Sequence, residues 1–293
     1  MGNKRTCALC SAEYEPAELS HIVPNFVYRW LMATSTTPFM RFGGQMNRRA
    51  QDGIKAHFLC CACEDRFEKH ENRFASEVFK PFAADNCYTT EHGQYMLQFA
   101  VSVSWRVLAY VQENHGLDHF RGRHAVAVAD TLATWQDYLL DRTQEIGVHE
   151  IHLVPFCGVI EHTCANVPNN INRYLRRAVE IDVGVSDTQA FTYTKLGPMI
   201  FIGLIKYPDL AHWQNTKIEK TGRFPPMNFT VPGSYQGYIF ARSKRMAELE
   251  AQISDRQKAK IEESYEKNRN RFEESDTYKT LLMDLDLQRK GKR

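Results

Sequence analysis

The 293-residue chain has no long apolar run, and this absence narrows its class. A helix needs roughly 20 predominantly apolar residues to cross a bilayer, and no stretch of the sequence approaches that length. The longest candidates, residues 97–111 and 199–205, are interpreted as core elements. Residues 1–6 also lack the apolar stretch of a secretion signal. We therefore expect a soluble protein of the cytoplasm.

A marked charge imbalance is absent as well. The sequence contains 37 lysines and arginines against 35 aspartates and glutamates, which leaves a formal net charge of +2. Because the overall field is weak, any affinity for nucleic acid must come from local basic patches. The sequence has no internal repeat and no Walker-type loop, so hydrolysis of nucleoside triphosphates is not expected.

Cysteine, by contrast, occurs with an informative spacing. The chain has two Cys-x-x-Cys pairs, Cys7 with Cys10 and Cys60 with Cys63. Each short knuckle turns its two sulfurs toward one point, so two knuckles can hold a zinc ion about 2.3 Å from four thiolates. Cys61 is then a spectator at the start of the following helix. Zinc-bound thiolates in a reducing compartment explain the cysteines better than disulfides, and we predict a structural Zn²⁺ ion.

The segment between the two knuckles contains a histidine flanked by apolar residues, His21, and ends its apolar run at Pro24. Together with the knuckles, this pattern resembles the zinc-containing HNH (ββα-metal) endonucleases over residues 1–83. In that family the histidine is the general base that activates water, and a residue on the helix after the second knuckle binds the catalytic metal. The resemblance implies His21 as the base, DNA as the substrate and Mg²⁺ or Mn²⁺ as the catalytic ion.

The helix after the second knuckle offers the candidate ligands for that ion. At about 100° per residue, Phe67 and Phe74 fall on one stripe, which marks the buried face. Glu71 lies near the centre of this stripe and Glu64 near its edge. A carboxylate that faces a core is costly unless it is paired, hydrogen-bonded or bound to a metal. We predict Glu64 and Glu71 as catalytic residues and metal ligands, with His70 as a further candidate ligand.

Other roles remain open for two of these groups. Glu71 can instead bond a backbone amide or an arginine such as Arg29 or Arg41. His21 can be structural, either bonding the backbone or replacing a cysteine at the zinc ion. The residue pattern alone does not choose between these roles.

Residues 33–52 are rich in threonine, serine, glycine and arginine, which predicts an exposed loop. Basic side chains on such a loop, or just after it, can contact phosphates and make DNA binding dependent on salt. The candidates for these contacts are Arg41, Arg48, Arg49 and Lys55.

The rest of the chain predicts an α+β fold in three parts. Residues 1–83 form the zinc-stapled ββα-metal module, and residues 84–148 form a helical connecting region with helices over 91–114 and 124–141. Residues 149–293 form a mixed α+β domain with a C-terminal helical tail. This last domain is expected to contain strands at 151–156, 190–194 and 199–205, a short helix at 171–179, and tail helices that Ser254 and Ser275 cap.

The leading hypothesis is a metal-dependent HNH-like endonuclease that hydrolyses DNA, acting as an effector in defence against foreign DNA, with a homo-oligomer or a larger defence complex as its assembly. The alternative is a non-catalytic zinc-stabilised module that binds nucleic acid or protein. Ser20, Lys55 and Glu64 favour the alternative, because the family usually has other residues at these positions. In a third interpretation, the zinc module caps an enzyme whose site lies in the C-terminal domain.

Overall fold

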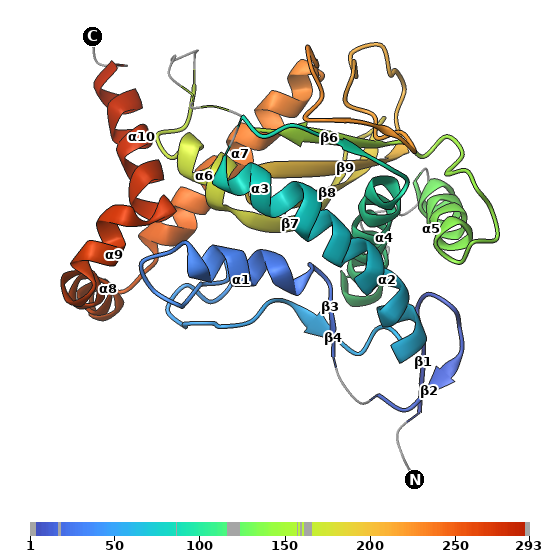
Figure 1. The fold of residues 1–293 in the computed structure, drawn as a ribbon, viewed down its shortest axis with the longest axis horizontal. Coiled ribbons are helices and arrows are strands. Elements are labelled where there is room, and N and C mark those ends of the chain that lie inside the picture. The colour runs from blue at the N-terminus through green and yellow to red at the C-terminus, as the bar shows by residue number, and fades with distance from the viewer. Residues whose placement is uncertain are drawn as a thin grey trace.

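The computed structural model describes residues 4–16, 19–85, 87–115, 124–156, 158, 160 and 166–290 as a mixed α+β fold (Figure 1). Its centre is a four-stranded antiparallel sheet in the order β6-β9-β8-β7. Within the described residues, no helix is long and apolar enough to span a membrane. The strands of this sheet are β6 (Ile151–Pro155), β7 (Val179–Val185), β8 (Ala190–Leu196) and β9 (Met199–Lys206).

The central hairpin of the sheet follows the pattern read from the sequence. β8 and β9 pair with Leu196 opposite Met199, around a turn at the expected position. Gly197 in this turn has a φ of +56°, and an added Cβ atom would lie 2.6 Å from the ring of Trp30. β7 was not predicted, because the helix expected over 171–179 ends earlier, at Arg177.

Alternate residues of the sheet point into two different cores. Along β9, Phe201 belongs to the core shared with the N-terminal half of the chain, whereas Ile200 and Ile202 belong to a core against the C-terminal helices. Both faces are therefore buried, as a near-continuous apolar strand requires. The helices around the sheet are α4 (Tyr95–His115), α5 (Ala125–Leu139), α6 (Ile171–Arg177) and α7 (Gly233–Ala251).

The N-terminal residues form two small hairpins beside a long helix. The first hairpin encloses the first knuckle, and its strands are not those that carry His21. Residues 5–24 of the sequence predict a hairpin with His21 on its second strand. This prediction is wrong, because the strand of His21 pairs with residues just before the second knuckle, and its hairpin spans the loop. The elements are β1 (Arg5–Thr6), β2 (Glu13–Tyr14), β3 (Ser20–His21), α1 (Asn25–Ala33), β4 (Lys55–Ala56) and α2 (Cys61–Phe74), which continues through a π-helical turn (Ala75–Phe79) into α3 (Lys80–Ala84).

The C-terminal tail is helical, as expected, and packs back onto the rest of the fold. The hydroxyl of Ser275 accepts a hydrogen bond from the backbone N–H of Tyr278 at 3.2 Å, which caps the last helix. Asp284 on that helix accepts the backbone N–H groups of Asn172 and Arg173 at the start of α6. The remaining elements are β5 (Thr90–His92), which pairs with β10 (Gly222–Phe224), and the helices α8 (Asp255–Lys267), α9 (Arg269–Glu274) and α10 (Asp276–Lys290).

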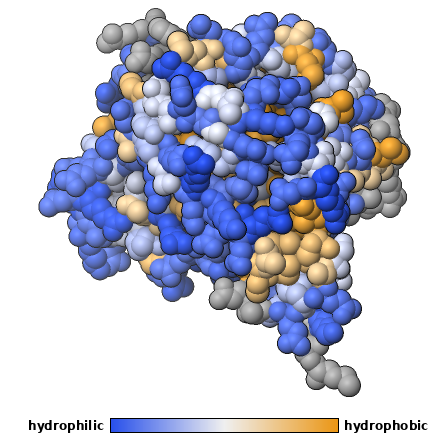
Figure 2. Space-filling view, turned by 45° about the vertical axis from the view of Figure 1, so that its right-hand side comes forward, coloured by the Kyte–Doolittle hydropathy of each residue, from blue (hydrophilic) through white to orange (hydrophobic). Residues whose placement is uncertain are grey.

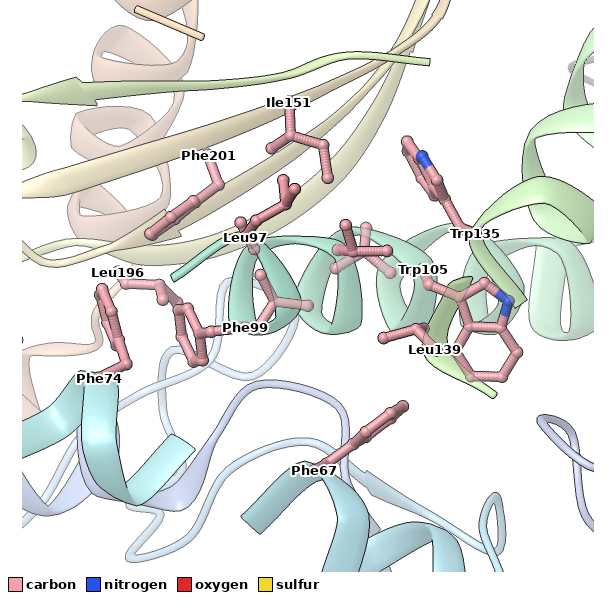
Figure 3. Packing of buried hydrophobic residues seen from close by; sticks show 14 of the residues in the cluster. Phe67, Phe74, Leu97, Phe99, Trp105, Trp135, Leu139, Ile151, Leu196 and Phe201 are labelled. Atoms are coloured by element: carbon pink, nitrogen blue, oxygen red, sulfur yellow. The ribbon is translucent and has the colours of Figure 1, made fainter. Parts of the chain in front are cut away.

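Aromatic rings join the N-terminal module to the sheet in one continuous core (Figure 3). The ring of Phe74 on α2 stacks on that of Phe99 on α4, with centroids 3.8 Å apart and planes at 10°. Both rings meet the ring of Phe201 on β9 edge-on, at 5.8 and 5.6 Å. The helix that follows the second knuckle is therefore held by the same core as the central sheet.

Replacing Phe74 with alanine tests how much this junction stabilises the protein. Because Phe74 is fully buried against two rings, we expect Phe74→Ala to lower the free energy of unfolding by about 3–5 kcal/mol. Urea unfolding followed by circular dichroism measures this loss. Val148→Ala, at an 80% exposed position, is the control and should change the free energy of unfolding by less than about 0.5 kcal/mol. Equal losses of unfolding free energy in the two variants would show that the contacts of Phe74 do not stabilise the protein.

Candidate metal centre and histidine site

The four cysteines of the two knuckles converge at one point. The sulfur atoms of Cys7, Cys10, Cys60 and Cys63 all lie within 4.8 Å of one another, and those of Cys10 and Cys60 are 3.7 Å apart. Four sulfurs at about 2.3 Å from a zinc ion form a tetrahedron with edges of about 3.8 Å. The donor set and its spacing therefore fit a tetrahedral metal ion such as zinc.

Backbone hydrogen bonds form each knuckle and join the two. In the first knuckle, Ser11 has a φ of +61° and donates its N–H to the carbonyl of Cys7 at 2.9 Å. The second begins α2, whose first-turn N–H groups bond the carbonyl of Cys60. Between them, the N–H of Ala8 donates to the carbonyl of Phe58 at 2.9 Å. These hydrogen bonds therefore bring the two knuckles together.

The thiols of the cluster influence one another strongly. A hydrogen bond from Cys63 is the largest contribution that lowers the pKa of Cys7, to about 4, although burial opposes it. The same contact raises the pKa of Cys63, and burial and the negative charge of Cys7 raise it further. Ionisation of Cys7 is thus favoured, whereas ionisation of Cys63 is opposed. A cation at the centre would stabilise further thiolates, and its binding would release protons.

The cluster lies close to the molecular surface. Cys7 and Cys63 are buried, whereas Cys10 and Cys60 are half-buried. Cys61 is exposed and lies outside the group of four. Figure 2 shows a mostly hydrophilic face with apolar residues gathered near its lower tip. A chelator can therefore approach the metal from the side of Cys10 and Cys60.

His21 forms an ion-pair contact with an aspartate that the sequence did not single out. Its Nε2 atom lies 2.7 Å from Oδ1 of Asp52, whose other oxygen is 2.5 Å from the ammonium of Lys55. Desolvation alone would raise the pKa of Asp52, but hydrogen bonds from Lys55, His21 and the Gly53 amide together lower it to about 2. Since an ionised carboxylate only accepts hydrogen bonds, Nε2 carries a hydrogen, and in the neutral form of the ring Nδ1 is then the acceptor.

The backbone around Asp52 is closely packed. Gly53 donates its N–H to Oδ1 of Asp52 at 2.8 Å, and a Cβ atom at this position would lie 1.9 Å from the ring of Tyr28. β3 and β4 pair with His21 opposite Lys55, which places Lys55 beside the same carboxylate. The only sequence signal for Asp52 was an Asp-Gly turn at the end of a predicted exposed loop.

Glu71 pairs with an arginine, as one of the alternatives allowed, but the arginine is neither Arg29 nor Arg41. Nη2 of Arg106 on α4, a residue only 1% exposed, donates to Oε1 of Glu71 at 2.6 Å. Nη1 of Arg106 donates to the carbonyl of His21 at 3.1 Å. Burial raises the pKa of Glu71, and the charge and hydrogen bond of Arg106 oppose this increase. The sequence missed Arg106 because it reads as an interruption in an apolar helix.

Glu64 and His70 lie in different surroundings on α2. The Oε1 atom of Glu64 is buried without a hydrogen-bond partner. The charges of Glu64 and His21 both shift the pKa of Glu71, so these three side chains share one electrostatic environment. His70 faces elsewhere: burial lowers its pKa, and its charged neighbours are Asp141 on one side and basic residues of α2 on the other. Across the part of the chain that the structure describes, no other three metal-ligating side chains lie as close as the cysteines.

The predicted phosphate-binding residues separate into two places. Lys55 is beside Asp52, as described above. Arg48 is exposed on the loop, and the guanidinium of Arg49 lies 4.8 Å from the ring centre of Phe39. Arg41 points toward the C-terminal helices, where it donates to Gln257 on α8 at 3.2 Å. After burial, the charge of Arg49 is the next cause that lowers the pKa of Arg41, whereas Lys55 pairs with Asp52.

Comparison of the chain with known protein families, curated proteins and solved structures finds no match. Function must therefore be argued from the residues themselves. The described residues offer two chemical features in the N-terminal module: a four-sulfur cluster and a histidine with an ordered acceptor nitrogen.

Removing one cluster cysteine tests the metal centre. Structural zinc contributes about 10–16 kcal/mol of apparent binding free energy, which matches or exceeds the whole stability of a typical domain, about 5–15 kcal/mol. We expect wild type to carry one zinc per chain, and Cys63→Ser to lose the metal and unfold the N-terminal module. Atomic absorption and thermal unfolding measure both effects. Cys61→Ser, which removes a neighbouring exposed thiol, should retain the metal. Similar zinc content in the two variants would show that Cys63 is not a metal ligand.

Removing the partner of Glu71 tests the buried ion pair. Arg106→Met leaves a buried carboxylate unpaired, which should cost about 3–5 kcal/mol of unfolding free energy. Without the guanidinium, the pKa of Glu71 rises further above its unfolded value. Stability should then fall as the pH increases through that interval, so the loss is larger at about pH 8 than at about pH 5.

Urea unfolding at the two pH values measures the effect of Arg106→Met. The control is Arg66→Met, because Arg66 bonds Asp141 at a solvent-exposed position of α2. An exposed pair contributes only about 0–1 kcal/mol. A loss for Arg106→Met that does not depend on pH would show that Glu71 does not require the positive charge.

Proposed function

We propose that this chain is a metal-dependent endonuclease that hydrolyses DNA phosphodiester bonds with His21 as the general base. The observation that carries the proposal is the 2.7 Å contact between Nε2 of His21 and the carboxylate of Asp52. A carboxylate that holds one ring nitrogen fixes the tautomer and leaves the other nitrogen to accept a proton. The hairpin that supplies both residues lies between the two knuckles, as in the HNH endonucleases that the sequence resembles.

In the proposed reaction, Nδ1 of His21 takes a proton from the water that attacks the phosphorus atom. Asp52 remains ionised, since its pKa is lowered to about 2, and it stabilises the imidazolium that forms. A positioned general base contributes roughly 10²–10⁴ to the rate. His21 is 19% exposed, so water and a phosphate can reach its ring while the remainder is shielded.

A divalent ion is part of this proposal, and the residues present fit it in part. Oε1 of Glu64 is a buried oxygen without a partner, whereas Oε1 of Glu71 is already bonded to Arg106. Mg²⁺ and Mn²⁺ sites of nucleic-acid enzymes often use one or two carboxylates and complete the coordination with substrate phosphate and water. Glu64 would hold the ion, with Glu71, whose pKa is shifted by the charge of Glu64 after burial and Arg106, as the second candidate ligand; when bound, the ion would stabilise charge on the leaving oxygen.

Basic residues around the hairpin would position the DNA. Lys55 follows Asp52 by three residues, and Arg48 is exposed on the preceding loop. Such contacts orient a backbone without reading its sequence. A cytoplasmic location and a role as an effector in defence against foreign DNA, alone or in a larger complex, are proposed on the resemblance and on the need for reduced thiols.

A second candidate is a zinc-stabilised module that binds nucleic acid or protein without cutting. The bond between Glu71 and Arg106 favours it, because that bond uses one of the two proposed ligand carboxylates for structure. The two candidates predict different outcomes in the same assay, since only a nuclease nicks the DNA that it binds.

Cleavage of supercoiled plasmid with Mg²⁺ or Mn²⁺ tests the base. We expect His21→Ala to reduce nicking by about 10²–10⁴, while zinc content and thermal unfolding stay at the wild-type level. His212→Ala changes an exposed histidine outside the module and should leave nicking unchanged. Asp52→Asn should also lower the rate, because it removes the charge that stabilises the imidazolium.

Equal nicking by wild type and His21→Ala would remove His21 from the mechanism. If both proteins bind the plasmid and neither nicks it with either ion, the binding-module proposal replaces the nuclease.

A further inference from the structure

A cavity of about 540 Å³ lies between the loop of the N-terminal module and the C-terminal helices. Its walls come from residues 35–49, from α6 and α7, and from α8. Its volume falls within the range of about 300–1,000 Å³ that is typical of small-molecule sites. It includes neither His21 nor the cysteine cluster among its lining residues.

The loop is docked firmly against the helices at this cavity. The side-chain oxygen of Asn47 accepts the N–H of Ser254 at 2.8 Å, and its amide nitrogen donates to the carbonyl of Gln252 at 3.3 Å. An added Cβ atom at Gly43 would lie 3.0 Å from the side chain of Leu249 on α7. The cavity is therefore a formed feature of the fold with walls from both ends of the chain.

Positive charge exceeds negative charge in the lining. Five arginines and two glutamates line the cavity among the described residues. Both glutamates are already engaged: Glu250 pairs with Arg173 at 2.5 Å, and Glu180 bonds Arg242, which is outside the lining. The charges of the remaining lining arginines are only partly balanced by residues in the wall.

Arg41 and Arg49 carry the uncompensated charge. Arg41 bonds the neutral side chain of Gln257, and Arg49 lies over the ring of Phe39. Neither has a carboxylate within ion-pair distance in the described part of the chain. Burial, followed by the nearby charge of Arg49, lowers the pKa of Arg41. Glu263 on α8 has its pKa lowered mainly by Lys267, with which it pairs, and to a lesser degree by the charge of Arg49. An anion in the cavity would stabilise both guanidiniums.

Two buried donors also lack acceptors. The Nε atoms of Arg41 and Arg173 are shielded from solvent and make no hydrogen bond. An unsatisfied buried donor of a charged group is costly, and the planar fork of arginine matches the oxygens of phosphate. Both donors belong to residues that line the cavity, so a movement of these two side chains toward a phosphate group in the cavity would give the donors an acceptor.

The remaining lining is apolar and aromatic. Tyr265 from α8 and Phe42 from the loop provide rings, and Met246 and Leu249 from α7 provide aliphatic surface. Burial raises the pKa of Tyr265, and the charges of Arg173 and Arg41 oppose this increase; all three residues line the cavity. The cavity therefore combines phosphate-binding groups with a surface suited to a flat ring.

We propose that this cavity is a binding site for a nucleotide, with the phosphates between Arg41, Arg49 and Arg173 and the base against the apolar wall. A duplex keeps its bases stacked inside and its phosphates on the outside, so it cannot place a phosphate and an adjacent base together in a cavity of this size. The site is separate from His21 and does not depend on the nuclease proposal.

Isothermal titration calorimetry of the full-length zinc-loaded protein, with ATP and with inorganic pyrophosphate in a buffer without divalent ions, tests the site. We expect ATP to bind more tightly than pyrophosphate, because only ATP contacts the apolar wall. The double variant Arg41→Gln with Arg49→Gln should weaken ATP binding by at least about tenfold, since charge-assisted hydrogen bonds are lost. Arg269→Gln, which removes an exposed charge of α9 outside the lining, is the matched control and should bind like wild type.

Three results would overturn the proposal. The first is that ATP at about 1 mM gives no heat of binding. The second is that wild type and the double variant bind ATP with equal affinity, in proteins that unfold at the same temperature and are therefore equally well folded. The third is competition: if a short DNA duplex releases bound ATP to the same extent that the duplex itself binds, these arginines would be assigned to DNA. Equal affinity for pyrophosphate and ATP would remove the nucleoside from the proposal and leave a phosphate site.

Discussion

One buried guanidinium connects the parts on which the rest of the structure depends. Arg106 extends from α4, which packs across the central sheet, and donates to the carboxylate of Glu71 on α2 and to the carbonyl of His21 on β3. Its charge also lies 5.1 Å from the ring centre of Phe67. A charge with 1% exposure is stable only when its donors are satisfied. The positions of α2 and β3 relative to α4 are therefore tied to one set of hydrogen bonds.

The cysteine cluster and the aromatic core act at opposite ends of α2. The cluster holds the first turn of the helix against the first knuckle, through Cys60 and Cys63. At the other end, Phe74 packs against both Phe99 and Phe201. Glu71 lies one turn before Phe74, so the buried ion pair is next to the aromatic contact. The cysteine cluster, the charge pair and the core thus follow one another along a single helix, and the strand of His21 packs beside it.

The sequence predicted local features well and side-chain partners poorly. Paired knuckles indicate a four-cysteine group because their spacing is short and local, and helical or strand periodicity located most long elements. The partner of Glu71 was missed because Arg106 lies 35 residues away on another helix. Asp52 was missed because loop residues carry no period. β7 was missed because its first residue, Val179, was assigned to the preceding helix and residues 180–185 were assigned to no element. Each failure involves contacts between segments distant in the chain, which local patterns do not encode.

The loop from α1 to β4 joins the two proposed sites physically. Its middle, with Arg41 and Arg49, lines the cavity, and its end carries Asp52, the partner of His21. A backbone bridge between Met40 and Ala50 closes the middle into a compact turn, so that Ala50 leads directly into the segment of Asp52. Because the turn is also bonded to the connection between α7 and α8, the C-terminal helices constrain the loop that orients the histidine. The C-terminal half of the chain is therefore part of the structural support of the His21 site.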